Sequence, residues 1–285
     1  MSYIREYKPK ALHGNTVTLE RFSSADEIVR ISETRKIRSC YASDDVRKRC
    51  RMSFHGVNSF DEATELLRYG YNPFVKKMQA KIDFTAKGDG VKTAFRNDVV
   101  GFAPIVPLAI KGVPNCMINS YKAPVKNKVV NIYFDKVAVC DKSTSQIEEA
   151  CSRFMSALIN VEMQGYRVNL TITEAHADGN KVDMMALKVK DANTPLDLQR
   201  ISFPLAHVAF FRAIGFDWFM RCPDAKITAY GLGHNMGRDY SHEDITKAYE
   251  EIFNEKCIVF EMEDIIKRSE QSIIDTITYA NQRYA

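Results

Sequence analysis

The 285-residue sequence has no apolar run near the roughly 18 residues that a membrane-spanning helix requires. Its first residues, Met1 to Lys8, also lack the apolar stretch of a secretory signal peptide. We therefore expect a soluble protein that stays in the compartment where it is made and makes no membrane contact. At 45% hydrophobic residues, the chain has enough apolar side chains for a large core.

Paired cysteines and complete catalytic signatures are missing as well. The seven cysteines are an odd number and contain no Cys-x-x-Cys pair, which favours reduced thiols over disulfides or a zinc site. The sequence contains no Gly-x-Ser-x-Gly elbow, no Walker motif and no kinase signature. These absences favour a binding or interaction protein over an enzyme.

Positive charge is concentrated in the first part of the chain. Residues 1–128 contain 23 Lys+Arg and 13 Asp+Glu, a net charge of +10, whereas residues 129–285 contain 17 and 23, a net charge of −6. This asymmetry predicts a basic face for nucleic acid or for an acidic partner. It equally suits two halves that attract each other, within one chain or head to tail between chains, so self-association stays open.

The strongest local pattern is a strand-helix-strand unit in the middle of the chain. The β-branched and aromatic run Val129–Val139 indicates a strand that is buried on both faces. Ser145 is the expected N-cap of an amphipathic helix, Gln146–Gln164, and Gly165 suits the left-handed end of that helix. A second strand, Arg167–Thr173, follows at once. Such a unit predicts a parallel crossover.

The elements that follow predict an α/β fold. A turn at 176–180 leads to a strand at Val182–Val189 that is antiparallel to the one before it, and helices then alternate with strands. We expect a doubly wound, mostly parallel sheet with an antiparallel edge at residues 128–285. Its order resembles that of Rossmann-like or von Willebrand factor A-like domains. A smaller, basic, mainly helical region, residues 1–127, precedes it, and its Pro-rich connection, residues 101–126, is expected to pack on the domain.

Two basic clusters in the N-terminal region are the candidate contact residues. They predict a phosphate-contacting surface or a surface for a protein partner, although a solvated helix face or loop explains the same pattern. No RNP-like or helix-turn-helix signature accompanies them. The residues are Arg35, Lys36, Arg38, Arg47, Lys48, Arg49 and Arg51.

Three segments of the chain resemble an uncharacterised family of tailed-bacteriophage proteins. They are Phe54–Gly70, the Pro-rich stretch Val100–Met117, and the central strand and helix with Gly165–Leu170, which follow in the same order. The resemblance covers roughly residues 54–175. It implies a viral origin and expression in a bacterial host cytoplasm, and it transfers no catalytic residue.

The loop between the central strand and helix carries a candidate metal site. Asp141-Lys-Ser-Thr-Ser145 is similar to the Asp-x-Ser-x-Ser motif of metal-dependent adhesion sites in von Willebrand A-like domains. The resemblance implies a hard cation such as Mg²⁺. Its ligands would be Asp141, Ser143, Ser145 and Thr194, with Asp264 or Glu261. The alternative is that Ser143 and Ser145 only start the helix.

Two weaker patterns lie between residues 231 and 243. Gly231–Gly237 resembles a phosphate-binding glycine loop, but it lacks the Gly-Lys-Ser/Thr ending. His234 and His242 have no zinc-ligand spacing. A plain loop explains both patterns.

These observations favour a phage-encoded, non-catalytic cytoplasmic protein that acts through macromolecular interaction. A host or phage protein is the preferred partner, and no cofactor is expected. Nucleic acid bound by the basic N-terminal half is one alternative. A Mg²⁺-dependent von Willebrand A-like domain or hydrolase using Asp141, Ser143 and Ser145 is the other.

Overall fold

A mixed sheet of six strands forms the centre of the protein, in the order β1-β2-β8-β7-β6-β9. The computed structural model describes residues 3–38, 45–81, 91–124, 128–138, 142–226 and 233–283. The strands are β1 (Tyr3–Tyr7), β2 (Thr16–Phe22), β6 (Lys128–Asp135), β7 (Tyr166–Asp178), β8 (Lys181–Lys190) and β9 (Ile258–Glu261). β6 runs parallel to β7 and β9, and β2 runs parallel to β8, whereas the β7–β8 and β1–β2 pairs are antiparallel. The predicted α/β fold is confirmed.

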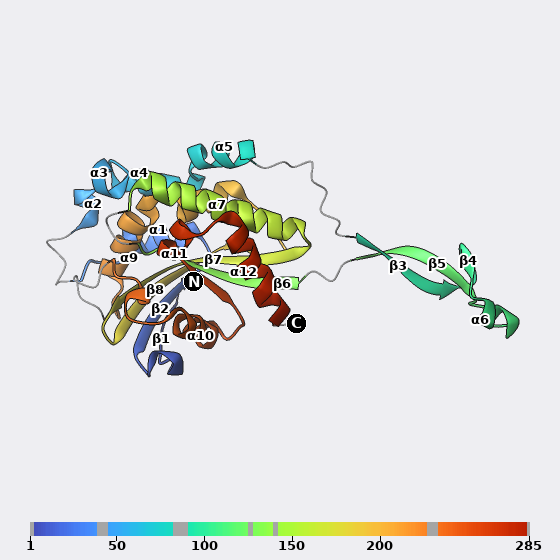
Figure 1. The fold of residues 1–285 in the computed structure, drawn as a ribbon. Coiled ribbons are helices and arrows are strands. Elements are labelled where there is room, and N and C mark those ends of the chain that lie inside the picture. Colours follow the sequence, from blue (N-terminus) through green and yellow to red (C-terminus); the bar gives the residue numbers. More distant parts are fainter. Residues whose placement is uncertain are drawn as a thin grey trace.

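Helices cover both faces of this sheet (Figure 1). The larger hydrophobic cluster contains residues of α7, α8 and α12, and the smaller cluster, on the other face, contains residues of α10. The helices of the larger side are α1 (Ala25–Thr34), α2 (Val46–Arg49), α3 (Met52–His55), α4 (Phe60–Tyr69), α5 (Asn72–Lys81), α7 (Thr144–Met163), α8 (Leu198–Ala206), the π-helical turn η3 (Phe210–Gly215), α9 (Phe216–Arg221), α11 (Met262–Lys267) and α12 (Glu270–Arg283). Those of the smaller side are η1 (Lys10–Leu12), η5 (Met236–Arg238) and α10 (His242–Phe253). Of the described helices, none combines the length and apolar composition needed to cross a membrane.

The predicted central unit is present as β6, α7 and β7, but α7 begins two residues earlier than expected. Its N-cap is Ser143, whose hydroxyl accepts the backbone N–H of Gln146 at 3.3 Å. The Gln146 side chain in turn accepts the backbone N–H of Ser143 at 3.0 Å. The prediction of Ser145 as the cap was wrong because both serines have a suitable partner three residues later, and the chain uses the earlier pair. Gly165 has a φ of 91°, as its position after α7 required.

The first strands of the chain belong to the same sheet as the last ones. β2 pairs along its whole length with β8, and β1 adds the edge beyond it. The carboxylate of Glu20 on β2 is buried, and it accepts two hydrogen bonds from Arg35 and one from the Trp218 indole. The expected boundary after residue 127 therefore separates strands that share one sheet and one core.

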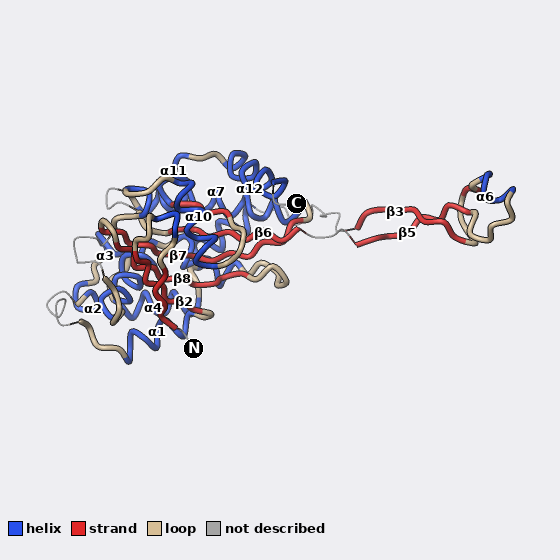
Figure 2. Tube along the Cα trace, turned by 90° about the horizontal axis from the view of Figure 1, so that it is seen from below, coloured by secondary structure: helices blue, strands red, loops and turns tan. Residues whose placement is uncertain are grey.

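Residues 91–124 form a projecting arm, which differs from the expected packed connection. The arm is a three-stranded sheet with one helical turn at its tip. Its elements are β3 (Val91–Asp98), β4 (Ala103–Pro104), α6 (Val106–Ile110) and β5 (Met117–Pro124). In both Figure 1 and Figure 2 the arm lies apart from the rest of the protein, which we call the body. The prolines suggested irregular backbone, but they lie at the tip and at strand ends, where no ladder hydrogen bond is lost.

The choice of cap for α7 is testable. Ser143→Ala removes the hydroxyl that accepts the Gln146 N–H, so we expect the free energy of unfolding to fall by about 1 kcal/mol. Ser145→Ala is the matched control and should change the free energy by less than about 0.5 kcal/mol. Urea denaturation followed by circular dichroism measures both. Equal losses in the two variants would contradict this assignment.

Candidate functional site

Exposed apolar side chains are concentrated on the arm. Within the described residues, twelve large hydrophobic side chains are exposed, and seven of them belong to the arm. They are Phe95, Val99, Val100, Phe102, Val106, Ile110 and Val113. Ile110 at the tip is the extreme case, with 82% of its surface exposed. Soluble proteins rarely leave apolar side chains clustered in this way unless a partner covers them.

The arm is an ordered structure with its own internal contacts. The N–H of Phe102 donates to the carbonyl of Ile118 at 2.9 Å, and the N–H of Ile105 donates to that of Cys116 at 2.6 Å. Gly101 lies so close to this strand that a Cβ atom there would be 2.1 Å from the Ile118 carbonyl oxygen. The rings of Phe95 and Phe102 pack edge to face, with 6.1 Å between their centroids. The exposed apolar surface is therefore held in a defined shape.

Three of the seven predicted cationic contact residues are used inside the body. Arg35 binds the buried Glu20 carboxylate at 2.7 and 2.8 Å. Arg38 donates to the carbonyl of Ala225 and lies over the Phe219 ring. Arg47 forms an ion pair with Asp217 at 3.4 Å. Removing these side chains would therefore disturb the fold as well as any surface they contribute to.

The other four predicted cationic residues lie on the surface. All four are exposed: Lys36 follows α1, Lys48 and Arg49 lie in α2, and Arg51 precedes α3. They form a smaller positive surface than the sequence predicted, because Arg35, Arg38 and Arg47 are engaged within the body.

The structure separates the residues of the predicted metal site. Asp141 lies outside the described residues. Ser143 caps α7, and its hydroxyl lies 3.1 Å from that of Ser145, beyond the carboxyl end of β6. The carbonyl of Thr194 accepts a hydrogen bond from Lys190, which pairs with the first half of β7, so Thr194 lies at the opposite end of the sheet from Ser143. Thr194 therefore cannot join Ser143 in one coordination shell.

The two acidic candidates for that shell are already engaged. Glu261 accepts the N–H of Gly237 at 3.0 Å, and Asp264 pairs with Arg268 at 2.7 Å. Both line a cavity of about 400 Å³ together with His234, Arg238 and Lys267. The lining of this cavity therefore carries both acidic and basic side chains. The rest of the predicted glycine loop, Gly231 and Leu232, lies outside the described residues. Within the described ranges, no cluster of three or more His, Cys, Asp or Glu residues is close enough to hold a metal ion.

Several ionisable groups are buried at or near the carboxyl ends of β6 and β7. Asp135 accepts the backbone N–H groups of Val137 and Ala175, both at 3.2 Å. Burial and the neighbouring Glu261 carboxylate raise the pKa of Asp135 well above its usual range. On the other face of the sheet, Lys136 donates to the carbonyl of Leu205, and burial lowers the pKa of its ammonium group. Perturbed groups of this kind occur at active sites and in structural cores alike.

Glu174 is the most unusual member of this group. It is fully buried, and neither of its carboxylate oxygens has a hydrogen-bond partner within the described part of the chain. Burial, followed by the charge of Asp135, raises the pKa of Glu174 well above its usual range. The carboxylate lies against Gly215, where a Cβ atom would be 1.5 Å from Oε2. Sequence pattern did not single out Glu174, because it continues a strand of mixed polarity.

His176, two residues further along β7, is also buried. Its Nδ1 accepts the N–H of Gly233 at 3.3 Å, which places the proton of the neutral imidazole on Nε2. Burial, with a smaller contribution from His234, lowers the pKa of His176 to about 3. This histidine is therefore neutral at ordinary pH, and it packs among the rings of Phe211, Phe216 and Phe219.

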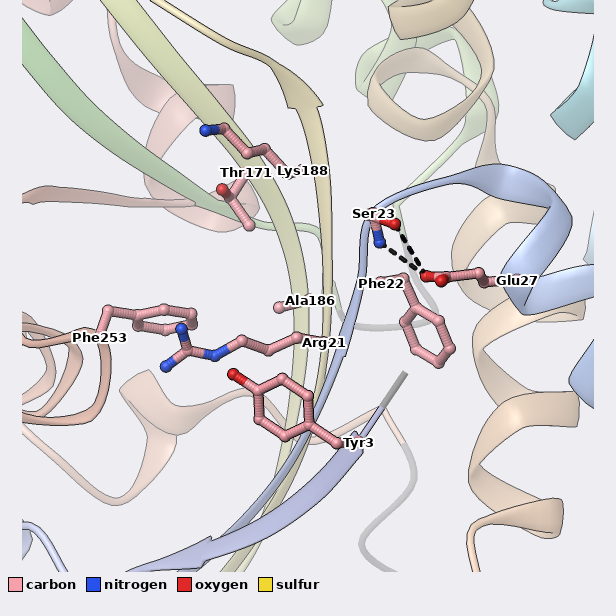
Figure 3. A pocket seen from close by; sticks show the side chains of 9 residues that line it. All are labelled: Tyr3, Arg21, Phe22, Ser23, Glu27, Thr171, Ala186, Lys188 and Phe253. Carbon is pink, nitrogen blue, oxygen red and sulfur yellow. Dashed lines mark hydrogen bonds between the residues drawn. The ribbon is translucent and has the colours of Figure 1, made fainter. Parts of the chain in front are cut away.

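An apolar pocket of about 250 Å³ opens near the first residues of the described chain. β1 meets β2 as far as the Tyr3–Arg21 pair, and the pocket lies around this end of the two strands. Figure 3 shows Arg21 extending toward Phe253, with Tyr3 beside it. The Arg21 guanidinium lies 4.3 Å from the Phe253 ring centroid and donates to the Ile252 carbonyl at 2.9 Å. The charge of Arg21 is thus engaged, and the aromatic rings line the pocket.

Residues 6–278 match a family model described as a domain of unknown function (DUF7192). The chain belongs to this family. The match spans the body and the arm together, so both are parts of the DUF7192 domain. No curated protein and no solved structure matches the chain.

The raised pKa of Glu174 makes a prediction about pH. The folded state holds its proton more tightly than the unfolded state, so this group should reduce stability as pH rises above about 4.5, the usual pKa. Glu174→Gln keeps the shape and cannot ionise. We expect this variant to lose less stability than the wild type between pH 4 and pH 8, as measured by urea midpoints. An ion pair with Lys136 would give the opposite result, a variant that is less stable at neutral pH.

The contact between Glu174 and Gly215 can be tested separately. Gly215→Ala places a methyl group on the Glu174 carboxylate, and such overpacking should cost about 1–3 kcal/mol of folding free energy. In a Glu174→Ala background the same change should cost clearly less, because the clashing carboxylate is gone. Additive losses in the double variant would show that the two sites do not interact.

Proposed function

We propose that this protein is non-catalytic and acts by binding another protein through its arm. The observation that carries the proposal is the clustering of exposed apolar side chains on one projecting, internally ordered element. Covering such side chains removes apolar surface from water, which is the main favourable contribution to most protein association. The body then acts as the rigid support from which the arm projects (Figure 1).

A protein partner is favoured over nucleic acid by the composition of the arm. Its tip, from Val99 to Val113, contains six of the exposed apolar side chains but only one cation, Lys111. A nucleic-acid surface needs several Lys or Arg side chains at phosphate positions. The surface residues Lys36, Lys48, Arg49 and Arg51 support nucleic acid as the second candidate.

Origin and location are part of the proposal. The resemblance of residues 54–175 to tailed-bacteriophage proteins supports a bacteriophage source, a bacterial host cytoplasm and a partner of host or phage origin. A Mg²⁺-dependent von Willebrand A-like domain ranks lower, because Thr194 lies at the other end of the sheet from Ser143.

Removing apolar side chains from the tip of the arm should abolish partner binding. Phe102→Ser with Ile110→Ser changes two exposed side chains of the arm. It removes the ring contact of Phe102 with Phe95 but no backbone hydrogen bond, so the fold of the body should be unaffected. Burying each side chain contributes about 1.5–3 kcal/mol, so the two losses together should weaken binding by at least about a hundredfold. Affinity capture from nuclease-treated bacterial lysate, with the bound protein quantified by mass spectrometry, measures this.

Arg49→Glu with Arg51→Glu is the matched control for the second candidate. It reverses two exposed charges on the body and leaves the arm intact. Capture that survives nuclease, is lost in the arm variant and persists in the charge variant supports the proposal. Capture that depends on nucleic acid and on the two arginines would replace it with the second candidate.

A further inference from the structure

We propose that the arm also binds a second copy of this chain, with its apolar tip in the pocket around the Tyr3 end of β1 and β2. This inference rests on the proposed function, since it names one protein that the arm binds. It joins two features that have no other explanation within one copy: an apolar projection and an apolar pocket in the body.

The pocket has the size and chemistry for a side chain from the arm. Its volume of about 250 Å³ accommodates an aromatic or aliphatic side chain. Tyr3, Ala186 and Phe253 supply apolar lining from β1, β8 and α10, whereas the Phe22 ring points to the other side of β2 (Figure 3). The cationic groups at its margin have partners already, because Lys188 pairs with Asp191 at 2.6 Å and Arg21 binds the Ile252 carbonyl.

The arm does not fill the pocket of its own copy. In Figure 1 and Figure 2 the arm extends away from the body, while β1 and β2 lie within it. A contact between tip and pocket must therefore join different molecules. Tip and pocket are different surfaces, so the contact is of the head-to-tail kind.

Charge favours this arrangement over pairing between two arms. The arm carries four Lys or Arg residues and a single acid, Asp98. α10, which ends at Phe253 in the pocket, carries four acids and Lys247, and Lys256 just after the helix pairs with Glu250 at 2.8 Å, so the four acids and two lysines have a net charge of −2. An arm lying along α10 of another copy therefore brings opposite charges together, whereas two arms side by side would repel each other.

The test is the molar mass of the full chain in solution, measured by sedimentation at several concentrations. The wild type should associate beyond the 32.5 kDa of one chain. Phe102→Ser with Ile110→Ser removes two apolar side chains of the tip. Thr171→Trp fills the pocket with a side chain that suits a strand. We expect each variant alone to remain monomeric. An equal mixture should form a dimer that stops at two chains, because it contains one intact arm and one intact pocket per pair.

Two controls keep this experiment decisive. Asn115→Ala, an exposed polar change on the arm, should associate like the wild type. Lys188→Trp blocks the same pocket from an exposed position, so it replaces Thr171→Trp if that variant fails to fold. A wild type that stays monomeric overturns the inference, and so does a pocket-filled variant that associates normally. If self-association fails, loss of lysate capture in the arm variant would still support the proposed function. The failure of this inference can therefore be distinguished from the failure of the proposed function.

Discussion

The central strands are buried on both faces, and this constraint decides where polar side chains can lie. Between β2 and β6 each strand has helices above and below it, so an ionisable group that enters the sheet either finds a partner there or, like Glu174, has a pKa shifted toward its neutral form. Glu20 finds its partners in Arg35 and Trp218, and Asp217, on a covering helix, finds them in Ser32 and Arg221. These contacts connect the first 35 residues to the segment around residue 220. They hold the N-terminal strands and the C-terminal helices in one core.

The same constraint explains why much of the basic N-terminal surface turned out to be structural. An arginine beside a buried carboxylate is more favourable inside the protein than either group alone. Arg35 and Arg47 are of this kind, since each lies beside a carboxylate whose side chain is fully buried. The net charge of residues 1–128 includes these arginines, although the buried carboxylates of Glu20 and Asp217 compensate their charge within the fold. Net charge therefore overstated the basic surface that is left for a partner.

The sequence predicted most of the body but not the arm. Helix caps are local signals: Ser24, Ser59 and Ser241 each accept the N–H of an acidic residue three positions later, a spacing that is visible in the sequence. The pairing of β2 with β8 joins residues more than 160 positions apart and has no local signal. The arm was missed for a different reason. Its apolar residues suggested burial, because sequence alone does not show whether an apolar side chain faces a core or a partner. Thr194 was wrongly predicted as a metal ligand. It follows β8, and because β8 runs antiparallel to β7, it lies at the other end of the sheet from Ser143.

The way the arm joins the body has a consequence for its history. Val91 at the start of β3 and Pro124 at the end of β5 are register partners, so their Cα atoms lie about 5 Å apart. To the body, the whole arm is equivalent to one short connection between α5 and β6. Its length and its tip can therefore diverge between relatives without any change in the sheet or its helices. Within one family, we expect the fold of the body to stay the same while the sequence of the arm changes with the partner that it binds.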